Sequence, residues 1–582
     1  MSPADTESLA EDRRARVRAA YRAIAEVDRP EVWIHLRDQA AVEADAVAAT
    51  GPLAGLLLAV KNNVDVAGHP TTAGCPSYAV EPAAQDARAV ARLRAAGATV
   101  LGTTNLDQFA TGLVGQRSPY GGVRDARRPA YVSGGSSSGS AVAVALGLVD
   151  LAIGTDTAGS GRVPASFQGI VGIKPTLGTV STDGVVPACR SWDAVTILAR
   201  DLATADAAMA AMAGGPGTRA WPADAPVAAP RTARVAVPST LPALAPGWGE
   251  AFTEAVERLR ADGCTVEPIP FGSFLEAARL LYDGGLVAER HAAVGRFVDT
   301  HRDEVDPTVG AIVSRAGEVS ASTMVRDLEA LERLRQRSMA LLDGFDALLV
   351  PTAPGHPTRA AVAADPIGVN TWVGTYTNFC NLFDLCGVAV PSGAVREADG
   401  DAQFGVTVLG RAFQDAAVLD LAHRVSVPAP SVAAAGARSA EPGAAAPWPV
   451  TAGVPTATLF VVGAHLVGQP LEHQLRERGA RWLGPATTAP AYALKALPTT
   501  PPKPGLVRVG AGGASIVGEM WELATGALGD FLAALPRPMS LGRVELADGR
   551  WVVGFGCDQE SAASAPDITD AGGWLAYLAA AG

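Results

Sequence analysis

Short apolar runs rich in β-branched residues alternate with Ala-rich stretches of helical period along most of the chain. The run ATVLGTTN (residues 98–105) follows the helical stretch DARAVARLRAAG (86–97), and ARVAVPST (233–240) precedes GWGEAFTEAVERLRADG (247–263). Strands that alternate with helices are typical of layered α/β folds. We therefore predict an α/β fold in which helices flank a central mixed β-sheet.

The last part of the chain has a different pattern, with closely spaced runs that resemble strands. These runs are TATLFVVGAHLVG (456–468), GLVRVG (505–510), SIVGEMWEL (515–523) and GRVELADGRWVVGFGC (542–557). Gly and Asp-Gly turns between such runs favour hairpins. This pattern predicts a small α+β domain at the C-terminal end.

One abrupt change of composition separates the two patterns. Residues 427–456 are rich in Ala and Pro and have almost no periodic apolar positions, which is typical of a linker. We predict a first domain over residues 1–426 and a second domain over residues 457–582. A shorter Pro- and Gly-rich stretch, residues 214–231, is predicted to be a surface loop of the first domain.

Composition and charge narrow the class of protein. Of the 582 residues, 48% are hydrophobic and 18% are charged, and the net charge is −12. This composition excludes a largely disordered chain, and the acidic balance disfavours nucleic acid or an anionic membrane as a partner. The six cysteines are scattered, so neither a disulfide framework nor a zinc site is predicted. The N-terminus lacks a signal peptide's apolar core, and no apolar run approaches the roughly 20 residues of a bilayer span, so we expect a cytoplasmic protein.

The densest candidate for chemistry is the turn SGGSSSGS (residues 133–140), which precedes an Ala-rich stretch. Gly139 is followed by Ser140 and not by lysine, which excludes a Walker A loop. Residues 135–139 match the nucleophile elbow G-x-S-x-G with Ser137 as the nucleophile, but a polar loop precedes them where the elbow needs a strand. A serine-rich helix cap is the structural alternative.

Two further features change the interpretation of this turn. A second small-residue turn, GTDTAGSGRVP (154–164), contains Ser160, and Lys61 directly follows the apolar run LAGLLLAV. Two turns separated by one helix and one short strand would bring Ser136 and Ser160 together. A lysine at the end of a buried strand is costly unless it is paired or neutral; the alternative is a lysine whose ammonium reaches solvent.

The flanks of these residues, AVKNNVDVAGHPTTAG, GGSSSGS and GTDTAGSGRVPASFQGIVGIKPT, resemble the amidase signature family. The resemblance implies that family's α/β fold and a Lys–cis-Ser–Ser triad of Lys61, Ser136 and Ser160, with neither a metal nor an organic cofactor. The backbone N–H groups implied for the oxyanion hole are those of Thr157, Ala158, Gly159 and Ser160. At Ala158 most of the family has Gly.

The implied triad makes a physical demand on Lys61. A lysine acts as a base only when neutral, so its pKa must fall by about 3 from ~10.4, at a cost of roughly 4 kcal/mol. Neutral Lys61 would accept the proton of Ser136, which relays the proton of Ser160 as Ser160 attacks the amide carbon. Backbone N–H groups would then stabilise the oxyanion.

Further segments, among them LLYDGGLVAERHAAVGRF, GTYTNFCNLFDLCGVAVPSG and VVGAHLVGQPLEHQL, are similar to allophanate hydrolases. This resemblance implies a carboxylated urea as substrate. It assigns the carboxylate to Tyr282 and Arg290, with Gly112 or Gly115 on the other side. Eight residues, about two helical turns, separate Tyr282 from Arg290, so we expect both on one helix face. Trp372 replaces a smaller or polar residue, which leaves the size of the pocket open.

The reaction implied is hydrolysis of allophanate to ammonia and N-carboxycarbamate, ending in two ammonia and two carbon dioxide. The alternatives are another small amide such as malonamate or biuret, an α/β-hydrolase that uses Ser137, and a non-catalytic protein that docks a urea carboxylase. The resemblance makes His465 a candidate base for the second step; the alternative is a structural histidine in a dimerisation or docking domain. We also expect a homodimer, functional coupling to urea carboxylase, and no nucleic-acid or membrane partner.

Overall fold

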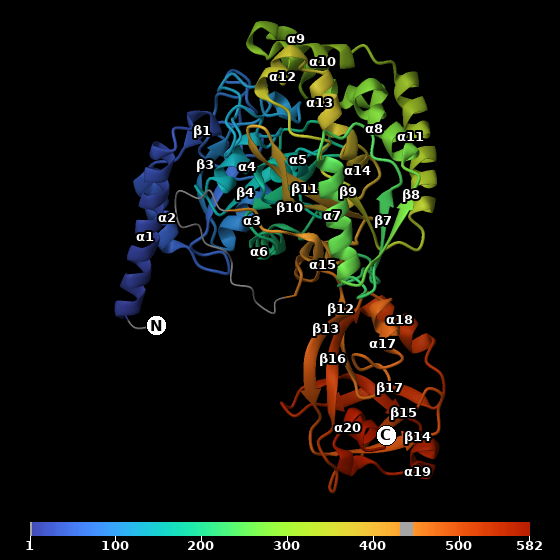
Figure 1. The fold of residues 1–582 in the computed structure, drawn as a ribbon. Helices are drawn as coiled ribbons and strands as arrows, with labels where there is room; N and C mark the ends of the chain where they lie inside the picture. Colours follow the sequence, from blue (N-terminus) through green and yellow to red (C-terminus); the bar gives the residue numbers. More distant parts are fainter. Residues whose placement is uncertain (1–2, 431–445, 582) are drawn as a thin grey trace. The chain divides into compact units, whose positions relative to one another are not determined.

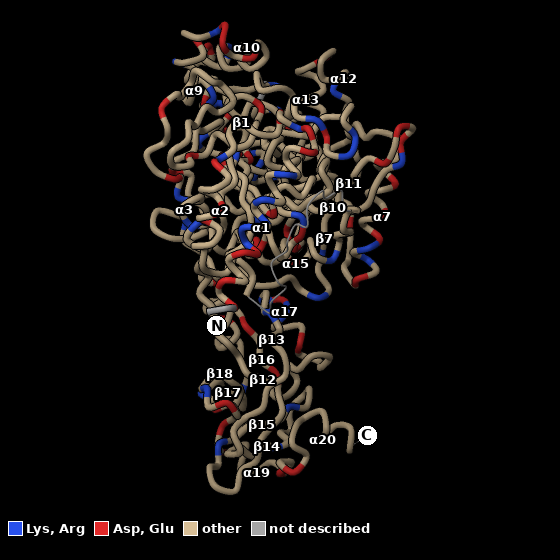
Figure 2. Tube along the Cα trace, turned by 90° about the vertical axis from the view of Figure 1, so that its left-hand side faces the viewer, with Lys and Arg blue, Asp and Glu red and all other residues tan. Residues whose placement is uncertain are grey.

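The computed structural model describes residues 3–430 and 446–581 of the chain (Figure 1). The chain divides into two compact units. The larger unit contains Met1–Ala220 and Ala233–Ala452, and the smaller unit contains Trp221–Thr232 and Gly453–Gly582. Basic and acidic residues are interspersed along the trace of both units (Figure 2). Of the helices described, none combines the length and the apolar character needed to cross a bilayer.

Within the described residues, a mixed sheet of 11 strands forms the centre of the larger unit. In sheet order the strands are β1 (Trp33–Leu36), β3 (Thr99–Thr104), β2 (Leu57–Lys61), β4 (Leu151–Asp156), β6 (Ala194–Ala199), β5 (Val171–Lys174), β10 (Cys386–Glu397), β11 (Gly400–Gly410), β9 (Ala347–Pro351), β7 (Arg234–Pro238) and β8 (Thr265–Ile269). The strands β3, β2 and β4 run parallel, as do β9, β7 and β8. The predicted central mixed sheet is confirmed.

Helices cover both faces of this sheet. One face carries α1 (Pro3–Glu26), α2 (Gln39–Ala48), α4 (Ser138–Ala145) and α5 (Arg162–Gln168). The other carries α3 (Arg88–Ala95), α6 (Leu202–Met212), α7 (Trp248–Ala261), α15 (Asp415–Val425) and α16 (Trp448–Thr451). Because both faces are covered, β2 and β4 are buried along their whole length, which explains why they are continuous apolar runs.

A further group of helices lies in the chain between β8 and β10. It contains α8 (Gly272–Asp283), α9 (Ala288–Thr300), α10 (Pro307–Ala316), α11 (Ala321–Leu341), α12 (Arg359–Ala364), α13 (Gly368–Val373) and α14 (Phe379–Leu382). Tyr282 and Arg290 lie on different helices, because the chain leaves α8 at Gly284 and makes a short 3₁₀ turn before α9. The expectation that they share one helix face is wrong, and the reason is the Gly-Gly pair, since glycine is a poor helix former.

Single 3₁₀ turns complete the secondary structure. They are η1 (Pro30–Val32), η2 (Gln108–Ala110), η3 (Gly285–Val287), η4 (Arg302–Glu304), η5 (Gly374–Tyr376) and η6 (Thr569–Ala571). Of these, η2 lies in the loop that follows β3, and this loop contributes to the candidate site described below.

The smaller unit is built around a five-stranded sheet in the residues described. Its order is β13 (Arg481–Thr487), β16 (Val517–Ala524), β12 (Thr456–Val461), β18 (Trp551–Cys557) and β17 (Met539–Glu545), and β14 (Tyr492–Leu497) pairs with β15 (Lys503–Arg508). The helices are α17 (Glu472–Arg476), α18 (Thr525–Ala533), α19 (Gln559–Ser564) and α20 (Trp574–Ala581). The predicted α+β character of the C-terminal part is confirmed.

Residues 221–232 pack with the smaller unit, although the flanking sequence belongs to the larger one. The Val227 N–H donates to the Gly479 carbonyl at 2.9 Å, and the Gly526 N–H donates to the Ala223 carbonyl at 2.6 Å. This part of the stretch therefore differs from the surface loop of the first domain that its composition predicts. Proline and glycine mark an irregular path but do not identify the unit against which that path packs.

The interval predicted as a linker, residues 427–456, is described only in part, since residues 431–445 lie outside the described residues. Within it, Trp448 is completely buried, and its backbone N–H donates to Asp206 of α6 at 2.9 Å. At least this portion of the interval packs against the larger unit. The domain limits drawn at residues 426 and 457 stay a sequence prediction.

The parallel strands β3, β2 and β4 place their carboxyl ends at the same edge of the sheet. Lys61 is the last residue of β2, the Ser160 turn follows β4, and the loop of residues 105–117 follows β3. In α/β sheets, ligands bind outside the carboxyl ends of the strands. This edge is therefore the place to look for a site.

Candidate active site

Lys61 is completely buried at the end of β2. Its Nζ donates hydrogen bonds to Ser136 Oγ at 2.8 Å and to Thr155 Oγ1 at 2.7 Å. Burial lowers the pKa of Lys61 from 10.5 to about 7, against the opposing effect of nearby carboxylates, chiefly Asp107. At neutral pH a large fraction of Lys61 is therefore uncharged and can accept a proton.

Ser136 and Ser137 share the turn before α4 but have different partners. A cis peptide bond joins Gly135 to Ser136, and Ser136 Oγ accepts the hydrogen bond from Lys61. Ser137 Oγ donates to the Thr155 carbonyl at 3.2 Å and accepts from the Thr155 N–H at 3.2 Å. Because the backbone engages the Ser137 hydroxyl in both directions, the geometry favours Ser136 over Ser137 as the partner of the base.

Ser160 lies on the buried turn between β4 and α5. Its Oγ donates to the Gly112 carbonyl at 3.4 Å, and its own carbonyl accepts the Ser137 N–H at 3.3 Å. The structure thus brings the two serine turns together. In the part of the chain described, no direct hydrogen bond joins Ser160 to Ser136; such bonds often tighten only when substrate is present.

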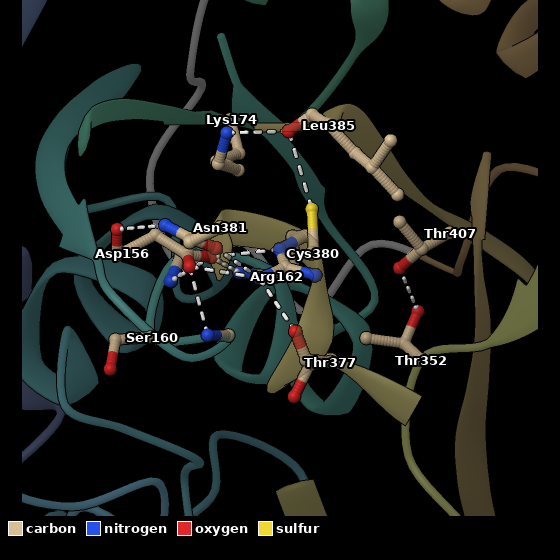
Figure 3. A network of polar contacts seen from close by, with 12 residues as sticks. Asp156, Ser160, Arg162, Lys174, Thr352, Thr377, Cys380, Asn381, Leu385 and Thr407 are labelled. Carbon is tan, nitrogen blue, oxygen red and sulfur yellow. Dashed lines mark hydrogen bonds and ion pairs between the residues drawn. The ribbon is translucent and has the colours of Figure 1, made fainter. Parts of the chain in front are cut away.

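An ion pair between Asp156 and Arg162 fixes the Ser160 turn (Figure 3). Both side chains are completely buried, and Arg162 donates to the two carboxylate oxygens from Nε and Nη2, each at 2.9 Å. Asn381 accepts from Arg162 at 3.0 Å and donates to the Asp156 carbonyl at 2.7 Å. Burial acts to raise the pKa of Asp156, but the charge and hydrogen bonds of Arg162 outweigh it, so the pKa lies below its ordinary value.

The backbone of the Ser160 turn presents fewer N–H donors than the sequence suggests. The Gly159 N–H donates to Asp156 Oδ1 at 2.8 Å. Gly159 has a φ of +126°, and a Cβ there would lie 2.4 Å from Thr377 Oγ1, so the turn requires glycine. Among the described residues, the N–H groups of the turn that make no hydrogen bond are those of Thr157, Ala158 and Ser160. The Gly159 N–H is therefore engaged within the turn, whereas the other three N–H groups have no hydrogen-bond partner within the described part of the chain.

Asp193 is a second carboxylate beside this turn, and it is partly buried. It accepts hydrogen bonds from the Thr157 hydroxyl and from the N–H groups of Ala188, at 2.9 Å, and Cys189, at 3.1 Å. Burial raises the pKa of Asp193, and the charge of Arg290 acts in the opposite direction. Across the described residues, no group of three or more His, Cys, Asp or Glu side chains is arranged to hold a metal ion.

Arg290 is completely buried near the start of α9. Its Nη1 donates to Thr111 Oγ1 at 3.0 Å, and the next residue, Gly112, accepts the hydrogen bond from Ser160. Of the residues expected at the carboxylate, the structure brings Arg290 and Gly112 to the serine turns. Tyr282 belongs to α8, but its side chain lies outside the described residues.

Two other residues singled out from the sequence have different surroundings. The Gly115 N–H donates to Asp107 Oδ2 at 2.9 Å, which makes Gly115 part of the loop's internal structure. The Trp372 indole N–H donates to the Ala243 carbonyl at 2.7 Å, and the ring packs beside Gly355. These contacts of Trp372 involve neighbouring loops and not the serine turns.

A cavity of about 730 Å³ is lined by residues of the segments 182–191 and 289–293, together with Asp65 and Tyr78. Asn63 Nδ2 donates both to Thr155 Oγ1 at 3.4 Å and to the carbonyl of Val186, which lines the cavity. Glu289, the neighbour of Arg290, lines it too and accepts the Ser191 N–H at 2.9 Å. Lys61, Ser136, Ser160 and Arg290 are not among the residues that line this cavity. Its connection to them is indirect, through Asn63 and through the helix that carries Arg290.

His465 lies in the smaller unit, in the loop between β12 and α17. It is buried, stacks on Phe555 with ring centroids 4.8 Å apart, and places Nε2 3.0 Å from Gln474 Oε1. Burial lowers the pKa of His465 to about 4, so the ring is neutral at pH 7. A cavity of about 410 Å³ is lined by His465 together with His473, Gln474, Arg478, Lys503 and Phe531.

Comparisons with known proteins cover both units. The family described as Amidase matches residues 10–419, and the family described as Allophanate hydrolase C-terminal domain matches residues 457–579. Urea amidolyase of Saccharomyces cerevisiae is 41% identical over 556 residues, which is 91% of this chain and 30% of that protein. Urea amidolyase of Lachancea kluyveri is 40% identical, over 90% of this chain and again 30% of the relative. The chain thus spans less than a third of the length of these two relatives.

Solved structures give the same result for the fold. Allophanate hydrolase of Kluyveromyces lactis has a TM-score of 0.87 at 37% identity, and the match covers 100% of this chain and 97% of that chain. The resemblance drawn from the serine turns is confirmed, and it extends through the smaller unit. The Amidase match alone covers more than half of the chain. The chain therefore belongs to the amidase family, and it carries an allophanate hydrolase C-terminal domain.

Proposed function

We propose that this chain hydrolyses allophanate to ammonia and N-carboxycarbamate. The observation that carries the proposal is the presence of a buried lysine and a buried arginine, with different chemical roles, at the serine turns. Lys61, with a pKa of about 7, is a base bonded to Ser136, and Arg290 is a buried guanidinium suited to a carboxylate. A small amide that carries a carboxylate uses both.

In the proposed mechanism Ser160 is the nucleophile. Neutral Lys61 accepts the proton of Ser136, Ser136 accepts the proton of Ser160, and the Ser160 oxygen bonds to the terminal amide carbon. The N–H groups of the Ser160 turn stabilise the oxyanion. When the tetrahedral intermediate collapses, the C–NH₂ bond breaks and the amine leaves as ammonia, with the proton returned through Ser136. Water then hydrolyses the acyl-enzyme by the same proton relay.

Arg290 would bind the carboxylate of allophanate, with Tyr282 as its partner and Gly112 or Gly115 at the opposite side of the substrate. Binding a charged group at a fixed point orients the amide over Ser160, and such orientation is a large part of catalysis. Support comes from the contact of Arg290 with Thr111, next to Gly112. Gly115 is the weaker candidate because its N–H is engaged by Asp107.

The smaller unit is proposed to act on the first product. N-carboxycarbamate loses carbon dioxide and is hydrolysed further, so the whole sequence yields two ammonia and two carbon dioxide. A neutral His465 at a cavity that also contains Lys503 and Arg478 suits a base beside a doubly charged anion. The competing role for this unit is dimerisation or docking, and then His465→Ala leaves ammonia stoichiometry and rate unchanged.

A limiting amount of allophanate tests the reaction, with released ammonia measured against biuret, malonamate and acetamide. We expect about two ammonia per allophanate and much slower release from biuret and acetamide. The Ser160→Ala variant should release none above the uncatalysed rate. Full activity of Ser160→Ala would remove Ser160 as the nucleophile, and wild-type protein that releases no ammonia above the uncatalysed rate would support the non-catalytic docking protein. Fast turnover of acetamide with allophanate inert would leave an amidase of different specificity.

We also propose that the chain works in the cytoplasm as a homodimer, coupled to a urea carboxylase that supplies allophanate. The name of the long yeast relatives, urea amidolyase, supports a connection to urea breakdown. Sedimentation equilibrium tests the dimer. Ammonia release from urea, ATP and bicarbonate, measured with an added urea carboxylase and with or without this chain, tests the coupling.

A further inference from the structure

The loop that follows β3 is held in one shape by its own hydrogen bonds. Asp107 accepts the N–H groups of Gly115 and Arg117, each at 2.9 Å, and the Arg117 guanidinium donates to the Thr111 carbonyl at 2.9 Å. The Leu113 N–H donates to Asn370 Oδ1 at 2.8 Å. Together these hydrogen bonds hold the backbone of the loop in one conformation.

The same loop contains two adjacent residues in an unfavourable conformation. Phe109 and Ala110 have φ angles of 52° and 53°, in the left-handed region that side chains other than glycine rarely adopt. Both residues are buried. Backbone of this kind persists only where the surroundings hold it, and it concentrates at functional sites. The loop therefore delivers Thr111 to a defined position at an energetic cost.

Thr111 and Gly112 contact the two functional groups of the site. Thr111 Oγ1 accepts a hydrogen bond from Arg290 at 3.0 Å, and the Gly112 carbonyl accepts one from Ser160 at 3.4 Å. One peptide unit separates these two residues, about 3.8 Å between Cα atoms. The separation between the guanidinium and the nucleophile is thus set by a single dipeptide of a rigid loop.

We propose that Thr111 is a positioning residue which, together with Gly112, sets the distance between Arg290 and Ser160. In allophanate, the proposed substrate, one atom separates the carboxylate carbon from the amide carbonyl carbon, so a fixed distance between the two groups would select amides with that spacing. This inference rests on the proposed function, because it takes Arg290 as the carboxylate group and Ser160 as the nucleophile. It adds to that function a residue and a rule of substrate length.

The threonine hydroxyl is suited to this task because it bonds in two directions at once. It accepts from Arg290 and donates to the Phe109 carbonyl at 3.2 Å. Serine preserves both hydrogen bonds, whereas valine has the same shape and preserves neither. The pair Thr111→Val and Thr111→Ser therefore separates the hydrogen bond from the packing of the side chain.

A longer substrate shows what the distance rule predicts. Succinamate has one more methylene than malonamate, so with its carboxylate on Arg290 the amide carbonyl is displaced by about one C–C bond, roughly 1.5 Å. A displacement of this size is enough to remove the alignment on which attack depends. Wild-type protein should therefore use malonamate at least about 100-fold better than succinamate, judged by kcat/KM.

The test measures kcat and KM for malonamate, succinamate and acetamide in wild-type protein and in the two variants. For Thr111→Val we expect the malonamate KM to rise by about 10-fold or more, the usual loss for a hydrogen bond to a charged group. The decrease in kcat/KM for malonamate should exceed the decrease for acetamide by a similar factor. The ratio of kcat/KM for malonamate to that for succinamate should become smaller. Thr111→Ser should stay within about 3-fold of wild type on every substrate.

Equal losses of Thr111→Val on malonamate and acetamide would overturn the proposal, since a merely structural role lowers both alike. If valine disturbs folding, Thr111→Ala removes the same hydroxyl without added bulk, and the same comparison applies. An unchanged preference for malonamate over succinamate in both variants would also overturn it.

A binding measurement keeps this inference separate from the proposed reaction. In the Ser160→Ala background, calorimetry gives the affinities of malonamate and succinamate without turnover. Malonamate binding that Thr111→Val weakens and Thr111→Ser preserves supports the positioning of Arg290 by Thr111 even if allophanate proves not to be the substrate. Malonamate binding that Thr111→Val leaves unchanged overturns this positioning role, whatever the enzyme hydrolyses.

Discussion

Replacement of Lys61 by methionine should abolish activity and stabilise the protein at neutral pH. Burial lowers the pKa of Lys61 from 10.5 to about 7, and each pKa unit corresponds to about 1.4 kcal/mol. Folding at pH 7 therefore costs about 5 kcal/mol for this residue, since the amine must give up most of its proton affinity. Methionine has a similar length and carries no such cost.

Part of this gain is lost through the partners of Lys61. Ser136 Oγ and Thr155 Oγ1 each lose a hydrogen-bond donor, and a buried polar group left without its partner costs about 1–3 kcal/mol. Both hydroxyls can still donate to other acceptors, so the lower part of that range applies to each. The net stabilisation by Lys61→Met is then about 1–3 kcal/mol at pH 7.

The pH dependence of the stability gain distinguishes relief of the Lys61 burial cost from a gain caused by better packing of methionine. Because the folded protein binds the Lys61 proton more weakly than the unfolded chain, the cost is absent above pH 10.5, grows as the pH falls towards 7, and is constant below 7. The advantage of Lys61→Met over wild type should therefore shrink by about 1.4 kcal/mol for each pH unit from 7 to 10. A packing effect does not vary in this way.

Equilibrium urea unfolding at pH 6, 7, 8 and 9 measures the difference, with ammonia release measured in parallel. Ser136→Ala is the matched control: it is also expected to be inactive, but it keeps the buried lysine. Its stability relative to wild type should vary little with pH. If Lys61→Met shows no gain at pH 7, or a gain that is the same at pH 9, Lys61 does not have the lowered pKa and the assigned base is refuted.

Three further outcomes are expected. The kcat/KM for allophanate should rise with pH along a limb with its midpoint near 7, because only neutral Lys61 accepts a proton; a flat profile between pH 5.5 and 8 would contradict this. Arg290→Ala should lower kcat/KM for allophanate by about 100-fold or more and for acetamide by far less, and comparable losses on both would remove the carboxylate role. Asp156→Asn breaks a buried pair with Arg162 and should destabilise the protein by about 3–5 kcal/mol; thermal unfolding at wild-type temperature would show that the pair does not hold the turn.

The elements, and the grouping of Lys61 with the two serine turns, were largely predictable from local patterns. Alternating strands and helices specify the α/β layers, and parallel strands place Lys61 beside the Ser160 turn by a general rule of sheet topology. The pair Asp156 and Arg162 was missed, although a signal existed. An aspartate that ends an apolar strand, followed six residues later by an arginine at a helix start, indicates a buried ion pair across a turn.

Other parts of the site carry no local signal. The contact between Thr111 and Arg290 joins residues 179 apart. It depends on the left-handed backbone of Phe109 and Ala110, which directly precede Thr111. Periodicity cannot indicate which N–H group of a turn is already engaged, as the Gly159 N–H is by Asp156. The helix break between Tyr282 and Arg290 was visible as Gly284–Gly285, and the error lay in giving spacing more weight than propensity.

The return of residues 221–232 to the smaller unit has a consequence for how this protein can be divided. The polypeptide passes from the larger unit to the smaller one, back again, and over once more. A cut anywhere in residues 427–456 therefore does not yield two self-contained pieces. The C-terminal fragment lacks the segment 221–232, which forms hydrogen bonds with Gly479 and Gly526. In the N-terminal fragment, Val227, which is buried in the intact protein, becomes exposed to solvent. During synthesis, residues 221–232 emerge from the ribosome before residues 453–582, with which they pack. The smaller unit can therefore complete its folding only after both segments have emerged.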